Sequence, residues 1–197
     1  QRGIKAGFNM KKTFKIVQNF RKNDQNTPII FMGYFNTIFQ FGLNDFFSKS
    51  SKVGVDGIIL VDLPPEEDNL ILTYLKKYNI DLIKLITPTT DKKRLKVILR
   101  AASGFLYYVS IMGITGTKKP SLEKVKCAVK SIKKETSLPV VVGFGISKKE
   151  QISEISEFAD GSVVGSSLVK IIEESLDKKI SKEKMYLKIK YFLKNLK

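Results

Sequence analysis

The chain has 197 residues, 43% of them hydrophobic and 27% charged, a composition typical of a folded globular domain and not of a disordered chain. It has no histidine and a single cysteine, Cys127, which excludes imidazole catalysis, imidazole metal ligands, an intramolecular disulfide and a thiolate metal cluster. The net charge is +16, but the cations are spread along the chain in pairs, which favours a solvated basic surface over a nucleic-acid groove.

Short apolar runs rich in β-branched and aromatic residues alternate with amphipathic segments, which predicts repeated strand–helix units. A helix is expected first, at 10–22, with no strand before it. The predicted strands follow at 28–34, 57–61, 81–86, 104–110, 139–143 and 161–165. The other predicted helices are at 43–52, 66–78, 92–101, 122–136, 148–157, 168–176 and 182–194.

Three of these helices begin with recognisable capping residues. Asp91 and Ser121 are predicted N-caps, because their side-chain oxygens can accept a hydrogen bond from the first helical turn. Ser147 is a third, and Glu150 three residues later is predicted to complete a capping box with it.

The predicted strands are mostly apolar throughout, as in parallel sheets that are covered on both faces. Six strand–helix units fit either an open doubly wound sheet or a barrel. The leading helix without a strand favours an α/β fold of the (β/α)8 TIM-barrel type, incomplete, with about six of eight parallel strands present. We therefore expect a single domain over residues 1–197 that lacks the first two strands.

Glycines follow three successive predicted strands, in segments that contain Gly116, Gly145 and Gly165. In barrels, active sites lie at the C-terminal ends of the strands, and phosphate often binds at the last loops and a helix N-terminus. Each loop alone is as readily a tight turn. Gly145 is followed three residues later by Lys148, which excludes a dinucleotide-binding fingerprint. Together the three loops predict a phosphate cradle.

Two further strand ends carry side chains suited to chemistry. After the strand at 57–61, Glu66 and Glu67 are explained as acids in the first turn of a proline-started helix, whereas Asp62 is left for function. Tyr107 and Tyr108 are adjacent and must face opposite sides of their strand. One phenol is therefore expected to point into the barrel, where it can donate or relay a proton, and the other to pack against helices.

Six segments, in this order and spacing, resemble the tryptophan synthase alpha subunit family: PIIFMGYFN (28–36), VGVDGIILVDLPPEE (53–67), LITPTT (85–90), GFLYYVSIMGITG (104–116), PVVVGFGIS (139–147) and ADGSVVGSSLVKII (159–172). The resemblance covers essentially the whole chain. It implies a lyase of tryptophan biosynthesis that cleaves indole-3-glycerol phosphate to indole and glyceraldehyde 3-phosphate. It also implies a heterotetramer with a beta subunit that carries pyridoxal phosphate (PLP), while the alpha chain has no cofactor or metal of its own.

The resemblance implies roles for individual residues. Tyr107 matches the active-site tyrosine. The other matches are to phosphate-binding positions at Gly116, Gly145, Gly165 and Ser166, to indole-pocket and mobile-loop positions at Phe144, Ile59 and Thr115, and to positions facing the beta subunit at Asn36, Asp62 and Pro64.

The chain departs from the family at its catalytic acids. The family's Glu, in an ELG-type motif, and its Asp, in a DPLADGP-type loop, have no match in these 197 residues. Because a positioned carboxyl contributes typically about 10²- to 10⁴-fold to rate, we expect little or no lyase activity from these residues alone. We interpret the sequence as incomplete.

Three other functions are weighed against this one. Another phosphate-binding barrel, such as an indole-3-glycerol phosphate synthase or a phosphoribosyl isomerase, shares glycine loops but not the DLPPEE and YYVSIMGITG segments. A non-catalytic protein that only activates a beta subunit is compatible with Asn36, Asp62 and Pro64. Nucleic-acid binding would have to persist above physiological salt, where purely phosphate-driven affinity falls steeply.

The sequence has no apolar run long enough to cross a membrane and no apolar signal segment. We therefore expect a soluble, cytoplasmic protein whose partners are a beta subunit and a small phosphorylated substrate, and not a membrane.

Overall fold

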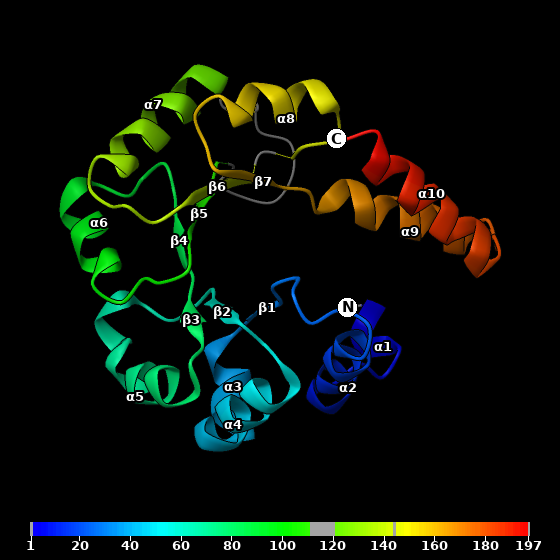
Figure 1. Cartoon of the computed structure of the whole chain (residues 1–197), viewed down its shortest axis with the longest axis horizontal. Helices are drawn as coiled ribbons and strands as arrows, with labels where there is room; N and C mark the ends of the chain where they lie inside the picture. The colour runs from blue at the N-terminus through cyan, green and yellow to red at the C-terminus, as the bar shows by residue number, and fades with distance from the viewer. Residues whose placement is uncertain (1, 111–120, 144, 197) are drawn as a thin grey trace. The chain divides into compact units, whose positions relative to one another are not determined.

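The computed structural model describes residues 2–110, 121–143 and 145–196, coloured from blue to red along the chain in Figure 1. The chain divides into two compact units. Unit 1 comprises Gln1–Lys84 and Lys96–Gly104, and unit 2 comprises Leu85–Leu95 and Phe105–Lys197. That both belong to a single domain stays a prediction.

Unit 1 holds a parallel sheet with strand order β1-β2-β3, in which Ile30 pairs with Gly57 and Gly57 with Asp81. Helices of the same unit cover one face of this sheet (Figure 1). Its elements are α1 (Arg2–Lys5), α2 (Met10–Arg21), β1 (Ile30–Gly33), α3 (Phe35–Phe41), α4 (Leu43–Val53), β2 (Gly57–Leu60), η1 (Pro65–Glu67), α5 (Asn69–Tyr78) and β3 (Asp81–Leu82).

The core of unit 1 is an aromatic cluster between β2 and its helices. Ile58 of β2 is 1% exposed and packs among the rings of Phe14 from α2 and Phe46 from α4, whose centroids are 5.9 Å apart. Phe47 stacks on Tyr74 of α5 at 5.7 Å. Because side chains alternate along a strand, the neighbours of Ile58 point to the opposite face.

Arg21, the last residue of α2, fastens this helix to the loops that precede β1 and β2. Its guanidinium donates to Gly54 O at 2.8 and 2.9 Å and to Thr27 O at 2.8 Å, and it pairs with Asp56 at 2.7 Å. Asp56 Oδ2 also accepts a hydrogen bond from Ile29 N at 2.7 Å. A single buried side chain therefore satisfies several backbone carbonyls at the N-terminal ends of the strands.

Unit 2 holds the strands that follow in the chain. The second sheet has the order β4-β5-β6-β7, and in its parallel pairs Leu106 lies opposite Val140 and Val141 opposite Gly161. β4 (Lys84–Ile86) and α6 (Lys92–Leu99) contain residues of both units. The remaining elements are β5 (Leu106–Val109), α7 (Leu122–Lys133), β6 (Val140–Gly143), α8 (Lys149–Ser156), β7 (Gly161–Val163), α9 (Ser166–Asp177) and α10 (Lys182–Lys194).

Asp160 repeats in unit 2 the arrangement of Asp56 in unit 1, since each immediately precedes the glycine that starts a strand. Its Oδ2 accepts from Val140 N at 2.8 Å, and its Oδ1 pairs with Lys133 at 2.8 Å. The hydrogen bond from Lys133, followed by that from Val140 N, lowers the pKa of Asp160 below its ordinary value.

This lowered pKa predicts a contribution to acid stability. A carboxyl with a depressed folded-state pKa stabilises the fold above its unfolded pKa of about 4 and loses that contribution as pH falls through the folded value. We expect the free energy of unfolding to fall less steeply below about pH 4 in Asp160→Asn than in the unmodified protein. Denaturant unfolding from pH 2 to 6 measures this, and identical slopes would contradict it.

The predicted strands and helices are confirmed, although several of their ends shift by one to three residues and some features differ. The segment 81–86 divides at Ile83 into β3, which pairs with β2, and β4, which pairs with β5. The helix predicted at 66–78 begins as the 3-10 turn η1, and α9 begins at Ser166 rather than 168. The short helices α1 and α3 were not predicted.

Two of the three predicted caps are confirmed and one is wrong. Asp91 Oδ1 accepts from Arg94 N at 2.7 Å, and Ser121 Oγ accepts from Lys124 N at 3.4 Å. At α8 the N-cap is Lys148 and not Ser147, and the capping-box partner is Gln151 and not Glu150, since Gln151 Oε1 accepts from Lys148 N at 3.1 Å. The helix begins one residue later than predicted, which moves the third helical position from 150 to 151.

Within the described ranges, no helix combines the length and the apolarity that crossing a membrane requires.

Candidate functional site

The two adjacent tyrosines of β5 face opposite sides of the strand, as predicted. Tyr108 is 3% exposed and lines a small cavity with Leu95 of α6 and Ile132 of α7, so it packs against helices. Tyr107 therefore points to the other face, where it is half-buried. Burial raises the pKa of Tyr107, so its phenol stays protonated at neutral pH and can donate a hydrogen bond.

The side chain of Tyr107 lies directly over Gly143, the last residue of β6. A Cβ atom on Gly143 would meet Tyr107 Oη at 2.6 Å and Tyr107 Cε2 at 2.7 Å. Position 143 must therefore be glycine for Tyr107 to keep this orientation. Sequence reasoning placed Gly143 only at the end of the predicted strand 139–143, because no local pattern reveals a contact between neighbouring strands.

A Gly143→Ala substitution is expected to displace Tyr107 and to cost about 1–3 kcal/mol of unfolding free energy, as other overpacked sites do. In a Tyr107→Ala background the same change should cost little, since the obstructing ring is gone. Denaturant unfolding of the two single variants and the double variant measures this coupling. Equal costs in both backgrounds would contradict it. Gly165→Ala is the control, because no atom of residues 2–110, 121–143 or 145–196 lies within 4 Å of a Cβ there.

The ends of β6 and β7 come together at the start of α9. Ser167 Oγ donates to Ile146 O at 2.9 Å, which fastens the loop containing Gly145 to the first turn of α9. Gly165 is the N-cap residue of α9, and Ser166 is its first residue. Gly145 has a φ of +63°, a conformation that favours glycine.

The backbone groups at this junction suit an anion chemically. The first N–H groups of an α-helix have no acceptor within the helix, and the helix dipole places partial positive charge there. Among the residues that the structure describes, no atom lies within 4 Å of a Cβ built on Gly165, so they leave the backbone open on that side. At the neighbouring strand end, Ser110 Oγ donates to Gly143 O at 2.6 Å and is thereby held in the strand layer. Sequence reasoning did not single out Ser110 or Ser167.

The structure thus brings together Gly145, Gly165 and Ser166 in unit 2. Three other predicted site residues, Gly116, Thr115 and Phe144, lie outside the described residues.

The residues predicted to face a beta subunit gather at the C-terminal ends of β1 and β2 in unit 1. Asp62 Oδ1 accepts from Phe35 N at 2.7 Å, so Asp62 caps the helix that contains Asn36. Asn36, Asp62 and Pro64 are all exposed. Because β1 and β2 are parallel, their ends lie side by side, and Val61 N donates to Gly33 O at 3.1 Å.

Ile59 lies on the face of the unit 1 sheet opposite its aromatic core. It is 5% exposed and pairs with Met32 of β1, and paired residues of parallel strands point to the same side. Met32, which sequence reasoning did not single out, is 58% exposed on that face. This placement is compatible with an apolar wall, as expected for Ile59.

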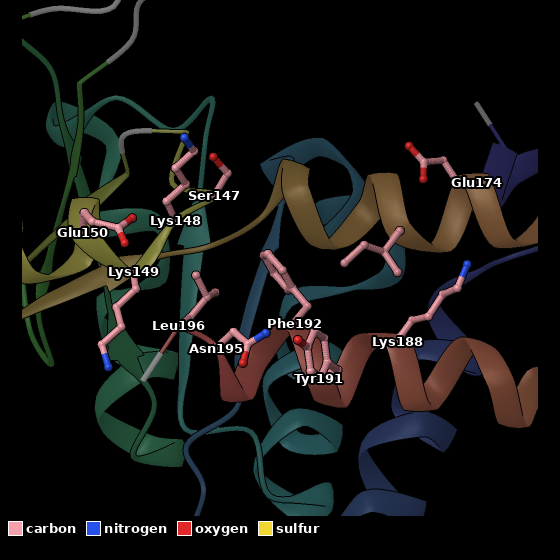
Figure 2. A pocket seen from close by; sticks show the side chains of 11 residues that line it. Ser147, Lys148, Lys149, Glu150, Glu174, Lys188, Tyr191, Phe192, Asn195 and Leu196 are labelled. Carbon is pink, nitrogen blue, oxygen red and sulfur yellow. The ribbon is translucent and has the colours of Figure 1, made fainter.

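A separate hollow of about 510 Å³ lies between the start of α8 and the helices α9 and α10. Figure 2 shows Lys188 of α10 and Glu174 of α9 on facing helices. The rings of Tyr191 and Phe192 lie between these two residues and the start of α8. None of the predicted site residues that the structure describes lines it. The hollow is therefore distinct from the strand-end site.

The polar groups gathered at the strand ends of unit 2 are backbone N–H groups, hydroxyls and a phenol. Such donors suit an anionic oxygen ligand. In the described part of the chain, no three Cys, Asp or Glu side chains converge as a metal site would require.

Comparison with known proteins points to one family. The model of the tryptophan synthase alpha chain family matches residues 1–197. A tryptophan synthase alpha chain of Methanocaldococcus jannaschii is 46% identical over 176 residues, which are 89% of this chain and 63% of that relative.

Solved structures agree with this match. The tryptophan synthase alpha subunit of Legionella pneumophila superposes with a TM-score of 0.83 and 37% identity over 91% of this chain and 66% of that one. A structure of the tryptophan synthase a2b2 complex of Pyrococcus furiosus gives a TM-score of 0.87 and 35% identity over 99% of this chain and 76% of that one.

These matches confirm the predicted fold class, an α/β fold with parallel strands of the TIM-barrel type. The chain spans slightly less than two thirds of the length of the Methanocaldococcus relative and of the Legionella chain. It belongs to the tryptophan synthase alpha chain family.

Proposed function

We propose that this chain supplies the phosphate-binding and partner-facing parts of an enzyme that cleaves indole-3-glycerol phosphate to indole and glyceraldehyde 3-phosphate. The observation that carries the proposal is the hydrogen bond from Ser167 Oγ to Ile146 O, which joins two glycine-containing loops at the start of α9. With the open backbone at Gly165, this junction suits the phosphate of the substrate.

The proposed reaction is a retro-aldol cleavage. The carbon–carbon bond between C3 of the indole and the glycerol side chain breaks, C3 gains a proton, and the adjacent hydroxyl loses one as it becomes the aldehyde. Of the family's active-site acids and tyrosine, only the tyrosine has a match here, Tyr107. We propose that its protonated phenol donates a hydrogen bond to the substrate, with Ile59 and Phe144 at the indole and Gly116 and Thr115 completing the site.

The proposed partner is a tryptophan synthase beta subunit that carries PLP, in a heterotetramer formed in the cytoplasm. The a2b2 complex of the Pyrococcus relative supports this proposal. Asn36, Asp62 and Pro64 are exposed where a partner could contact them. No cofactor is proposed for this chain itself.

A second candidate function is activation of the beta subunit without lyase chemistry. It is favoured by one observation: the residues proposed to face the partner are exposed and held in place, with Asp62 bonded to Phe35 N. Assays of the protein with a beta subunit separate the two candidates. Indole release from indole-3-glycerol phosphate supports the lyase, and faster synthesis from serine and added indole without such release supports the activator.

The phosphate site can be tested separately by titrating ¹⁵N-labelled protein with glycerol 3-phosphate. We expect saturable shifts of the amide signals of Gly145, Gly165 and Ser166, because these N–H groups would donate to phosphate oxygens. Glycerol, which has the same carbon skeleton without the phosphate, is the control and should leave these signals unchanged. Shifts elsewhere only, or none, would overturn the proposed phosphate site.

A further inference from the structure

Two oppositely charged side chains are buried together in unit 1. Lys84, the first residue of β4, pairs with Asp68, which lies between η1 and α5. The Lys84 side chain is 8% exposed and that of Asp68 is 4% exposed. Neither residue was singled out from the sequence, and neither belongs to the strand-end sites described above.

Such a pair adds little to stability by itself. Removing two charges from water is costly, and their mutual attraction offsets that cost only in part. Burial accordingly raises the pKa of Asp68, while the hydrogen bond from Lys84 opposes that rise. Apolar residues of similar volume often serve stability as well or better, whereas a buried pair fixes one geometry. The pair is therefore better explained by what it holds in place.

Asp68 anchors the C-terminal end of segment 62–67, most of whose residues are exposed. Its backbone N donates to Pro65 O at 3.4 Å, and its carbonyl accepts from Ile71 N at 3.0 Å, so it joins this segment to α5. The front of the segment is anchored separately, by the bond from Phe35 N to Asp62 and by the burial of Leu63. Asp62 and Pro64 are both exposed, and Pro64 lies between the two anchored ends of the segment.

We infer that Lys84 is a positioning residue for partner binding: by holding Asp68, it fixes segment 62–67 in the conformation that docks the beta subunit. This inference rests on the partner proposed above. It assigns Lys84 no contact with substrate or partner.

Three variants test the inference. Lys84→Met removes the cation, and Lys84→Met/Asp68→Leu replaces the pair by apolar side chains. The third variant, Arg21→Lys, is the control: it weakens the separate interactions of Arg21 with Asp56 and Gly54 O, at the N-terminal ends of the strands. Calorimetric titration with a beta subunit gives the Kd of each protein, and thermal unfolding gives its Tm. Titrations are made at a temperature at which circular dichroism shows every variant folded.

We expect both Lys84 variants to bind the beta subunit about 2- to 30-fold more weakly than the unmodified protein, the range usual for residues that act on a site without touching it. The double variant should recover the Tm that Lys84→Met loses, yet not the affinity. Arg21→Lys should lower the Tm and leave the Kd unchanged. If Lys84 only stabilised the fold, the Kd would recover together with the Tm in the double variant.

The inference is overturned if the double variant regains the unmodified affinity together with its Tm, or if Lys84→Met binds normally. In either case the proposed partner binding stands, since the unmodified protein still binds. If the unmodified protein does not bind a beta subunit at all, the partner proposal fails and this inference fails with it.

Discussion

Replacing Arg21 with methionine is expected to lower the free energy of unfolding by about 3 kcal/mol, a large part of the stability of a typical domain. The methionine keeps much of the side-chain volume but cannot donate the hydrogen bonds that Gly54 O and Thr27 O now accept from the guanidinium. A hydrogen bond to a charged group contributes about 1.5–3 kcal/mol, and these bonds are only partly buried. Asp56, whose side chain is 50% exposed, can turn to water and so adds less.

Denaturant unfolding of Arg21→Met, Arg21→Lys and Asp56→Asn separates these contributions. Lysine can keep the charge pair with Asp56 but cannot reach both carbonyls in the way a planar guanidinium does, so its loss should be intermediate. Asp56→Asn keeps an acceptor for Ile29 N and should cost least. If Asp56→Asn were as harmful as Arg21→Met, the ion pair and not the carbonyl bonds would carry the stabilisation.

Local patterns in the sequence were sufficient for most of the fold. Apolar runs located every strand of the two sheets, because a strand covered on both faces must be apolar along its length. The alternation of side chains required Tyr107 and Tyr108 to face opposite ways, which the cavity lined by Tyr108 confirms.

Features that depend on distant residues could not be predicted in the same way. Helix α3 has no capping side chain at Tyr34, and its cap is supplied by Asp62, 27 residues later than Phe35. From the sequence, Arg21 could not be told from the other cations of the basic surface. In the structure it is buried and bonded to Gly54 O and Asp56, which are more than 30 residues away in the sequence. A window that covers one helix contains neither partner.

The candidate phosphate site contains both a feature that the sequence predicted and one that it could not predict. Glycines after successive strands indicated which loops to consider, since only the topology of parallel strands is needed to place their ends at one edge. The bond that joins two of these loops, from Ser167 to Ile146, has no sequence signature, because serine after a strand is common. The family match decides against the rival barrel families but leaves the role of each residue as a proposal.

Replacing Gly165 with aspartate is expected to weaken the binding of glycerol 3-phosphate by about 100-fold, equivalent to about 2.7 kcal/mol. A carboxylate at this N-cap position would itself accept the hydrogen bonds of the first helical turn and would repel the phosphate. Two unit charges about 4 Å apart interact by about 4 kcal/mol at an effective dielectric constant of 20, and screening by solvent reduces this value.

The same substitution should leave the fold intact, which makes the result specific. The described part of the chain leaves room for a side chain, since none of its atoms lies within 4 Å of a Cβ on Gly165, and aspartate is a better N-cap than glycine. We therefore expect an unfolding free energy that is unchanged or a few tenths of a kcal/mol higher.

Gly165→Asn is the matched control, because asparagine has the same shape and capping ability without the charge. Calorimetric titration of both variants should show that asparagine keeps most of the affinity while aspartate loses it. If the two variants bound equally well, the start of α9 would not lie near the phosphate, and the anion would have to be placed elsewhere in unit 2.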